Sequence, residues 1–327
     1  MSLGMNCFGF LKEILAGDPP HSAWGLWEDN HLGSLNYLSD EKLLETAKNE
    51  IKTGERISLN LPLDLIDPPF LGRAPFERKI INKAPRVIND DIITFNTQLS
   101  SQWDSFRHFA YQKEAKFYNG VTQNDIHDTT DSTAGACSNW NARGVVGRGI
   151  LIDYYSWARE NGIEFDPITN SAIHLDQIKK IISEKNVTLQ RGDILFLRTV
   201  LAYLLLIPGF VDGYGQLNSS GRESLAKLGR FPGICQSRET AEWLWNHQFA
   251  AVAADSPAFE CIPPVDHDWM LHPILLSGWG TPIGELFDLD ALSEICKRLG
   301  RWSFFLTSSP LNYTGAVATP PNAIAIF

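Results

Sequence analysis

Cysteines are few in this sequence, and none of them are paired by spacing. The five cysteines, at positions 7, 137, 235, 261 and 296, are scattered, and no Cys-x-x-Cys pattern occurs. An odd and scattered set is typical of reduced thiols, rather than of disulfides or a structural zinc site. We therefore expect a cytoplasmic protein.

Long apolar segments are also missing. The longest apolar run, residues 200–207, is far shorter than the roughly 20 residues that cross a bilayer. The first 15 residues lack a basic segment followed by a long apolar one, so we expect no signal peptide. Both absences lead us to expect a soluble protein.

Clusters of positive charge do not occur. The chain has 28 Lys and Arg against 38 Asp and Glu, a net charge of −10. An acidic chain without a basic stripe is a poor partner for nucleic acid or an anionic membrane. We expect a small-molecule substrate and no nucleic-acid or membrane partner.

Several well-known catalytic signatures are absent as well. No Gly-x-x-x-x-Gly-Lys-Ser/Thr loop occurs, and no Gly-x-Gly-x-x-Gly follows a predicted strand, which argues against phosphate-loop and dinucleotide sites. No Gly-x-Ser-x-Gly occurs either, which argues against a serine hydrolase of the α/β-hydrolase type.

The chain is long enough to bury a large core. It has 327 residues, of which 44% are hydrophobic. A chain of this length buries about three quarters of its unfolded surface and needs no disulfide or metal to fold. No repeat or linker divides it, so we expect an N-terminal arm, 1–38, and a single domain, 39–327. Trp24 and Trp27 either fasten this arm to the body or reach a pocket.

The apolar patterns predict alternating helices and strands. Helical spacing predicts helices over 40–52, 175–184, 237–247 and 289–299. Apolar runs predict strands over 56–63, 145–153, 193–198, 249–255 and 302–307. The Pro-rich stretch 67–85 is predicted to form a long excursion over the surface. This alternation predicts an α/β fold with a mixed β-sheet core and flanking helices.

The densest polar cluster lies in the segment FNTQLSSQWDSFRHF. Its side chains Gln98, Gln102, Asp104 and His108 all occupy even positions. On a straight strand, the stretch from Gln98 to Asp104 would span about 20 Å, so the chain must bend near 100–101 if these groups are to converge. Asp104 and His108 are acid/base candidates because an imidazole titrates near neutral pH. An Asp and a His four residues apart also occur as a surface or capping pair.

A second polar pair flanks a Gly-rich turn in HPILLSGWGTPIGELFDLDAL. His272 and Glu285 are both usable metal ligands. Their separation is not a metal signature by itself. The alternative interpretation is a histidine at the edge of the core and a glutamate that precedes a helix.

Taken together, these segments resemble the cyclase family, which includes bacterial kynurenine formamidase and isatin hydrolase. The resemblance covers nearly the whole chain, with further matches in WGLWEDNHLGSLNYLS, VVGRGILID, RGDILFLRT, AAVAADSPAFE and PLNYTGAVATPPNAIAI. The family motif is HxGTHxDxPxH, followed much later by a His and a Glu. Gln98 and Gln102 occupy the positions of its first two histidines, while Asp104 and His108 match its Asp and its last His. The distal pair matches His272 and Glu285.

The resemblance implies a hydrolase of an amide, lactam or lactone bond in a small metabolite. In the family, the first two histidines and the Asp bind a divalent metal, the distal pair can complete a second metal position, and the last motif His acts as general base. The implied catalytic residues are His108, Asp104 and Glu285. The implied metal ligands are Asp104, His272, Glu285, Gln98 and Gln102. The candidates for substrate binding are Gln98, Gln102, Trp103, Trp24 and Trp27.

The two glutamines are the main departure from the family. An amide oxygen is a weak ligand that suits hard ions such as Mn²⁺ or Mg²⁺ better than Zn²⁺. The cofactor is therefore a divalent metal (Mn, Mg or Zn) or none. One alternative is a metal-independent cyclase, dehydratase or isomerase of specialised metabolism, and another is a non-catalytic binding protein on the same fold. The resemblance also implies a homodimer or homotetramer in which the arm, with Trp24 and Trp27, lies near a neighbour's pocket.

Overall fold

The computed structural model describes residues 18–129, 132–165, 170–199, 214 and 217–327. The apolar run 200–207, Cys7 and residues 1–17 of the predicted arm lie outside these residues. Among the described residues, no helix is both long and apolar enough to cross a bilayer.

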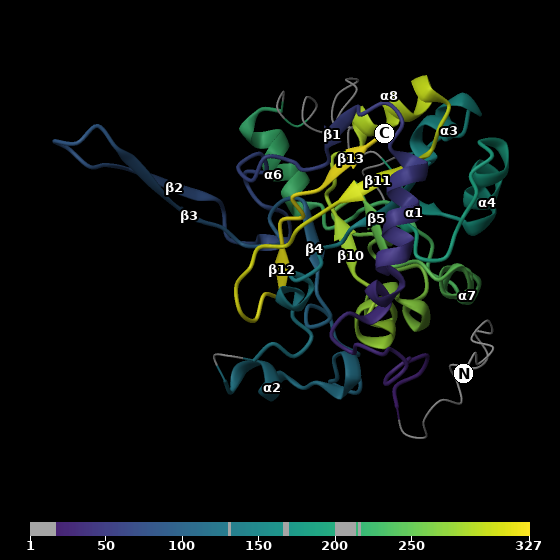
Figure 1. Cartoon of the computed structure of the whole chain (residues 1–327), viewed down its shortest axis with the longest axis horizontal. Helices are drawn as coiled ribbons and strands as arrows, with labels where there is room; N and C mark the ends of the chain where they lie inside the picture. Colours follow the sequence, from purple (N-terminus) through teal and green to yellow (C-terminus); the bar gives the residue numbers. More distant parts are fainter. Residues whose placement is uncertain (1–17, 130–131, 166–169, 200–213, 215–216) are drawn as a thin grey trace.

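A nine-stranded sheet forms the centre of the molecule (Figure 1). Its spatial order is β1-β13-β11-β5-β7-β9-β10-β4-β12. The middle strands β5, β7, β9 and β10 run parallel, and the strands toward both edges pair antiparallel. The bounds are β1 Arg56–Ser58, β13 Ile324–Ile326, β11 Ser303–Thr307, β5 Gly147–Asp153, β7 Ile194–Arg198, β9 Ala251–Ala254, β10 Ile283–Glu285, β4 Gln102–Asp104 and β12 Ala318–Thr319.

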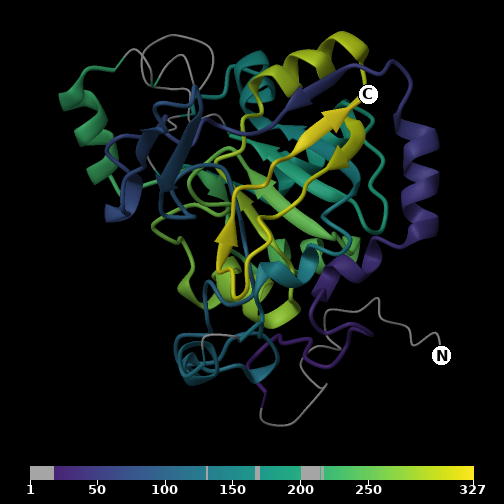
Figure 2. The same cartoon turned by 60° about the vertical axis from the view of Figure 1, so that its left-hand side comes forward.

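Helices cover this sheet, which confirms the predicted mixed α/β fold (Figure 2). The main helices are α1 Asp40–Glu50, α3 Tyr154–Glu160, α4 Leu175–Glu184, α6 Ser219–Lys227, α7 Arg238–His247 and α8 Asp290–Leu299. Shorter elements are α2 Gln123–His127, the 3-10 turns η2 Gly33–Tyr37, η3 Phe70–Gly72, η4 Tyr118–Gly120, η5 Cys137–Trp140 and η7 His267–Trp269, and the π-helix η8 Pro273–Trp279. A two-stranded sheet joins β6 Ala172–Ile173 to β8 Gly233–Ile234.

The central strands are buried on both faces. In β5, Ile150 and Ile152 belong to one hydrophobic cluster, while Leu151 belongs to another. Neighbouring residues of a strand point to opposite faces, so the two clusters lie on the two sides of the sheet. This explains why the parallel strands read as continuous apolar runs instead of alternating ones.

Two of the predicted helices have clear end signals, whereas the helix predicted over 40–52 already ends at Glu50. Ser237 caps α7 by accepting the backbone N–H of Thr240 at 3.1 Å. Gly300 ends α8 with φ +60°, the left-handed conformation that glycine adopts without strain.

One prediction about the first third of the chain was wrong, and another was incomplete. The strand predicted over 56–63 ends at Ser58, because the backbone then leaves the sheet edge and makes only an isolated bridge at Asn60. The excursion predicted over 67–85 contains a strand, β2 Glu77–Asn82, which pairs with β3 Asn89–Thr94. This hairpin is separate from the central sheet and projects from the body (Figure 1).

Candidate active site

Strand β4 places two polar side chains on one face of the central sheet. Gln102 and Asp104 are two residues apart, so both point the same way. In the antiparallel pairing with β10, Gln102 lies opposite Glu285. The Gln102 amide Nε2 donates to Glu285 Oε2 at 2.8 Å. Both side chains are buried, as is Asp104, which has no exposed surface.

A turn just before β4 brings Gln98 onto this group, as the predicted bend requires. Gln98 Oε1 accepts from Gln102 Nε2 at 3.1 Å, and Gln98 Nε2 donates to Asp104 Oδ1. The turn is held in place by Ser101, whose hydroxyl donates to the carbonyl of Leu286 and accepts the N–H of Leu61. The two glutamines therefore tie the carboxylates of Asp104 and Glu285 into one network.

Trp103 points to the opposite face of β4 and does not join this group. Its ring is completely buried against Phe287, and its Nε1 donates to Ser308 Oγ at 2.9 Å. Gly284 makes this packing possible, since a Cβ there would lie 2.7 Å from the Trp103 ring. The residue expected to bind substrate is thus part of the core.

His272 lies between two carboxylates. Its Nδ1 is 2.6 Å from Glu260 Oε1, and its Nε2 is 3.0 Å from Glu285 Oε1. Glu260 is completely buried and also accepts the backbone N–H groups of Leu271 and His272 and the amide of Gln236. Sequence analysis missed Glu260. No local pattern marks it, because its partners are brought to it only by the fold.

The electrostatics of the group follow from burial and from these pairs. Burial by itself would lower the pKa of His272, but the hydrogen bonds and charges of Glu260 and Glu285 raise that pKa well above its ordinary value. Burial raises the pKa of Asp104, and the charge of Glu285 adds to this effect, while His108 opposes it. His272 therefore holds a proton between two carboxylates. The ionised form of Asp104 is disfavoured by burial.

His108 connects this buried group to a pocket. Its Nε2 is 3.8 Å from Asp104 Oδ2, and its Nδ1 is 3.4 Å from the Gln98 amide. Unlike its neighbours, the His108 side chain keeps 24% of its surface exposed. The pocket holds about 530 Å³ of space and is open to solvent. Its lining residues are Leu71, Arg73, His108, Phe109, Phe231, Pro257, Ala258, Ile262, Met270, His272 and Glu285.

The donor atoms at the base of this pocket fit a divalent ion. Ligand atoms of Asp104, His272 and Glu285 lie within 4.8 Å of one another. Two buried oxygens beside them, Asp104 Oδ2 and Gln102 Oε1, have no hydrogen-bond partner. A set of three oxygen donors and one imidazole suits Mn²⁺ or Mg²⁺ better than Zn²⁺. An ion there must displace the proton on His272 Nε2, so its binding depends on pH.

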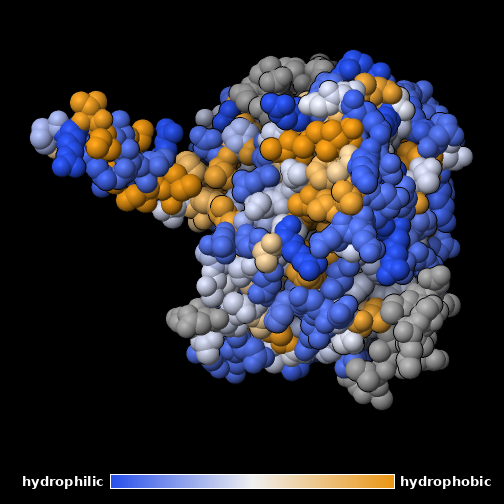
Figure 3. Space-filling view, viewed as in Figure 1, coloured by the Kyte–Doolittle hydropathy of each residue, from blue (hydrophilic) through white to orange (hydrophobic). Residues whose placement is uncertain are grey.

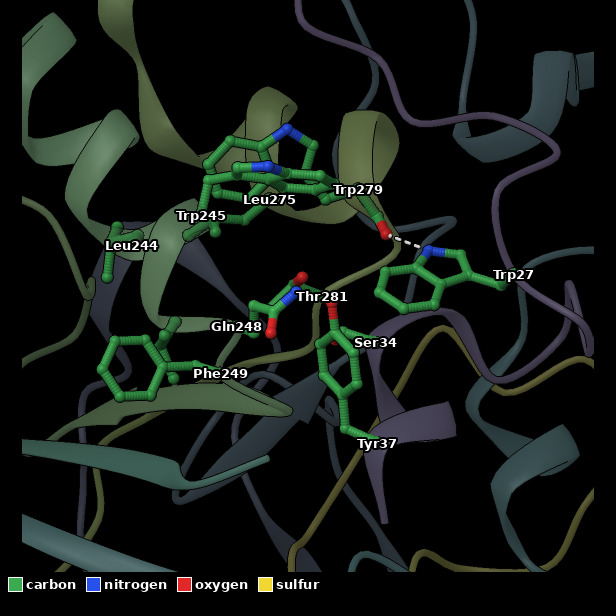
Figure 4. A pocket seen from close by; sticks show the side chains of 11 residues that line it. Trp27, Ser34, Tyr37, Leu244, Trp245, Gln248, Phe249, Leu275, Trp279 and Thr281 are labelled. Carbon is green, nitrogen blue, oxygen red and sulfur yellow. Dashed lines mark hydrogen bonds between the residues drawn. The ribbon is translucent and has the colours of Figure 1, made fainter. Parts of the chain in front are cut away.

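Trp24 and Trp27 lie outside the pocket that His108 lines. Trp24 Nε1 donates to the carbonyl of Ser277 at 2.7 Å, and Trp27 Nε1 donates to that of Trp279 at 2.8 Å. Both rings thus fasten the described part of the arm to η8. Trp27 also lines a smaller aromatic pocket with Tyr37, Trp245 and Trp279 (Figure 4). None of the acid/base residues described above lines that pocket.

Comparisons with known proteins agree with this architecture. The family model described as "Putative cyclase" matches residues 38–261. A crystal structure described as a novel cyclase is 29% identical, covers 94% of this chain and 100% of its own, and has a TM-score of 0.79.

More distant structures share the fold. Isatin hydrolase A from Labrenzia aggregata, bound to benzyl benzoate, is 15% identical with a TM-score of 0.55, over 83% of this chain and 93% of that one. Isatin hydrolase A from Ralstonia solanacearum is 13% identical with a TM-score of 0.54, over 83% and 91%. Among curated proteins, no match is found. Since the family model matches well over half of its length, the chain belongs to the cyclase family.

Proposed function

We propose that this protein is a hydrolase that opens an amide, lactam or lactone bond of a small metabolite, as kynurenine formamidases and isatin hydrolases do. The observation that carries the proposal is the position of His108. This side chain faces the pocket and also contacts the buried polar network through Asp104 and Gln98. An acid/base group needs both access to the substrate and a fixed orientation.

His108 acts as the general base in this proposal. It takes a proton from a water molecule in the pocket as that water attacks the carbonyl carbon. Asp104, 3.8 Å from His108 Nε2, stabilises the imidazolium that forms. His108 then returns this proton to the leaving group, because it lines the pocket in which that group forms. Glu285 and His272 lie at the base of the same pocket.

A divalent ion fits this site, and Asp104, Gln102, His272 and Glu285 would hold it. When bound, it would act as a Lewis acid on the substrate carbonyl. Gln98 would hold Asp104 in position, because its amide nitrogen already donates to that carboxylate.

The walls of the pocket suggest the kind of substrate. Seven of its eleven lining residues are apolar, and Arg73 is the one lysine or arginine among them. No ion pair is recorded for Arg73 within the described part of the chain, and its Nη1 donates only to the carbonyl of Gln98. A flat apolar ring that carries a carboxylate matches both features, because guanidinium binds carboxylate with two parallel hydrogen bonds.

A metal-independent cyclase, dehydratase or isomerase is the second candidate. It is favoured by the amide groups of Gln98 and Gln102, which donate to Asp104 and Glu285. These donors satisfy part of the negative charge that a metal would otherwise neutralise. In that case His108 and Asp104 would move protons without activating a water.

One assay separates the two candidates. The protein would be stripped with a chelator and then tested with and without Mn²⁺ or Mg²⁺ on a formylated aryl amide and a five-membered lactam. Mass spectrometry would show whether the product has gained water. Metal-stimulated gain of water that is lost in His108→Asn supports hydrolysis, whereas loss of water or an isomer from stripped protein supports the second candidate.

The cellular setting is part of the same proposal. The described cysteines are all free and buried, which suits a reducing compartment such as the cytoplasm. We expect the enzyme to work there as a homodimer or homotetramer, with 39–327 as its catalytic domain.

A further inference from the structure

Apolar side chains outside the active site occur on a projecting surface and around a pocket. The β2–β3 hairpin exposes Ile80 and Ile92, and Figure 3 shows hydrophobic residues along its length. By contrast, Trp27, Trp245 and Trp279 are buried side chains that surround a space (Figure 4). Small molecules bind in concave sites lined by apolar and aromatic groups. The aromatic pocket therefore has the form of a ligand site, and the hairpin does not.

Two aromatic pairs form the walls of this pocket. Trp27 and Tyr37 come from the N-terminal part of the chain, and their ring centres are 4.9 Å apart with planes at 86°. Trp245 on α7 and Trp279 on η8 have ring centres 5.1 Å apart with planes at 58°. About 290 Å³ of space lies between the walls. This is just below the range of roughly 300–1,000 Å³ that drug-sized ligands use, so the pocket fits a ligand with a single aromatic ring.

The aromatic pocket is separate from the active site but is joined to it by two segments. The two pockets share no lining residue. The helix η8 begins directly after His272, which lines the active-site pocket, and ends with Trp279, which lines the aromatic one. Thr281 lines the aromatic pocket just before β10, the strand that ends at Glu285. A ligand in the aromatic pocket therefore contacts both segments that carry these active-site residues without occupying the active site.

One buried hydroxyl of the pocket lacks a partner. Thr281 is only 4% exposed, and within the part of the chain that the structure describes its hydroxyl makes no hydrogen bond. Ser34, which lines the same pocket, instead donates to the carbonyl of Ala250 at 2.7 Å. A buried hydroxyl without a partner costs free energy. A ligand with a polar edge would supply the missing partner of Thr281.

Gln248 brings a second polar group into the pocket at a cost in backbone strain. It follows α7 with φ +54°, a left-handed conformation that favours glycine, whereas α8 ends with Gly300 in the same conformation. Figure 4 shows the Gln248 side chain between the Trp245–Trp279 pair and Tyr37. Strained residues of this kind cluster at ligand-binding positions. The glutamine amide offers a ligand both a donor and an acceptor.

The charges around the pocket favour a neutral ligand. Its lining contains no Asp, Glu, Lys, Arg or His, and burial raises the pKa of Tyr37 to about 12, so the phenol stays protonated at neutral pH. A carboxylate bound there would be buried without a cation. Aromatic cages can bind organic cations. Here, however, the Arg191 guanidinium already lies 4.7 Å from the centre of the Tyr37 ring, and it would repel a second cation.

We propose that this pocket binds a small, uncharged aromatic amide. The ring of the ligand packs between the two aromatic pairs, its amide pairs with the Gln248 carboxamide, and the Thr281 hydroxyl makes a further hydrogen bond. This ligand differs in charge from that of the active-site pocket, where Arg73 favours an anion. The proposal does not depend on the hydrolase function, because binding here uses none of the acid/base residues.

Isothermal titration calorimetry with three single-ring probes tests the class of ligand. Benzamide is neutral, benzoate is anionic and phenyltrimethylammonium is cationic. The titrations use the Arg73→Leu protein, so that the active-site pocket does not retain benzoate. We expect benzamide to bind with a Kd of about 1 mM or tighter, as its small size allows, and the two charged probes to bind at least about 10-fold more weakly. Absence of benzamide binding, or tighter binding of either charged probe, contradicts the proposal.

Variants locate the bound benzamide. Thr281→Val removes the hydroxyl and keeps the size of the side chain, and Gln248→Gly removes the amide and relieves the backbone strain. We expect each to weaken benzamide binding about 10-fold, with the melting temperature of Gln248→Gly unchanged or raised. Asn186→Gly is the matched control and should bind normally, because Asn186 has φ +52° just after α4 and does not line the pocket. Binding that is unchanged in both pocket variants, or lost in His108→Asn, would place benzamide outside the aromatic pocket and overturn the proposal.

Discussion

Gln102 and Glu285 face each other on adjacent antiparallel strands, and the Gln102 amide donates to the Glu285 carboxylate at 2.8 Å. Gln98 makes the equivalent contact with Asp104. Two amide groups therefore hold the two carboxylates that the family motif assigns to metal. This arrangement suggests that metal selectivity depends on these two positions.

Replacing both glutamines should change that selectivity. In Gln98→His/Gln102→His, two imidazoles join Asp104 and His272, and soft-to-borderline nitrogen ligands favour Zn²⁺. We expect Zn²⁺ affinity to rise by at least about 100-fold, because changes in residues that only support the ligands already shift metal affinity by about 10-fold to 100-fold. Isothermal titration calorimetry with Zn²⁺ and Mn²⁺ measures this. Adding Asp104→Asn should cancel most of the gain, and equal Zn²⁺ affinity in wild type would contradict the expectation.

His108 should matter for catalysis far more than for stability. General-base catalysis contributes typically about 10²–10⁴ in rate. The side chain is part-exposed and its polar contacts are long, 3.4 and 3.8 Å, so His108→Asn should lower kcat by about that factor and leave the melting temperature nearly unchanged. His127→Asn, on the short helix α2, is the control. A variant that keeps wild-type kcat would remove His108 from the mechanism.

Glu260 should act as a positioning residue for His272. Glu260→Gln keeps the size of the side chain but removes the negative charge beside a buried, protonated imidazole. Loss of one partner of such a pair costs about 3–5 kcal/mol. Urea denaturation should show a loss of that order, and kcat should fall while KM changes little. Glu242→Gln, which disturbs only the part-exposed pair with Arg238, should cost less than about 1 kcal/mol.

Arg73 should set the preference for anionic substrates. Arg73→Leu removes the guanidinium from the pocket wall and makes that wall more apolar. We expect KM for a carboxylate-bearing substrate to rise about 10-fold to 100-fold, as loss of a charged hydrogen bond predicts, with a neutral amide of the same ring unaffected. Equal effects on both substrates would mean that Arg73 acts through its hydrogen bond to Gln98 instead.

The pH dependence of stability should carry the signature of Asp255. Burial raises its pKa to about 6, from an ordinary value of 3.8, although Thr199 donates to it twice. A raised carboxyl pKa means that the folded state binds the proton more tightly, so stability falls as pH rises from about 4 to about 6 and is constant above that range. The loss is about 3 kcal/mol at 1.36 kcal/mol per pKa unit.

Asp255→Asn should remove the contribution of Asp255 to this slope, because asparagine keeps the oxygen that accepts from Thr199 but does not titrate in this range. Asp193, whose pKa burial also raises to about 6, keeps its own contribution. The measurement is the free energy of unfolding in urea at several pH values between 4 and 8. A variant with the same slope as the wild type would assign the titration to another group.

The sequence was a good guide where local pattern determines structure. The helix over 175–184 and the buried strands around 147–153 and 194–198 were predicted because amphipathic spacing and continuous apolar runs are visible within a short window. The bend before β4 was predicted as a condition, because the reach of an extended chain lets these polar residues converge only if the chain bends near 100–101. The structure shows both the bend and the convergence.

The sequence was a poor guide where distant segments meet. Strand β4 has three residues, too few for any periodicity, and its pairing with β10 spans more than 180 positions. Glu260 and Arg73 become site residues only through the fold. The hairpin was missed because its isoleucines are interspersed with charges, which reads as a solvated loop when no partner is in view.

Strand β4 has a polar face and an apolar face, so its register against β10 determines which side chains reach the site. A slip of one residue against β10 would turn Trp103 toward the pocket and drive two polar side chains into the apolar layer. Gly284 favours the observed register, because a residue without a Cβ leaves room there for the Trp103 indole. A glycine that does not line the pocket thus determines which side chains do, and directed evolution of the pocket should leave Gly284 fixed while the pocket walls vary.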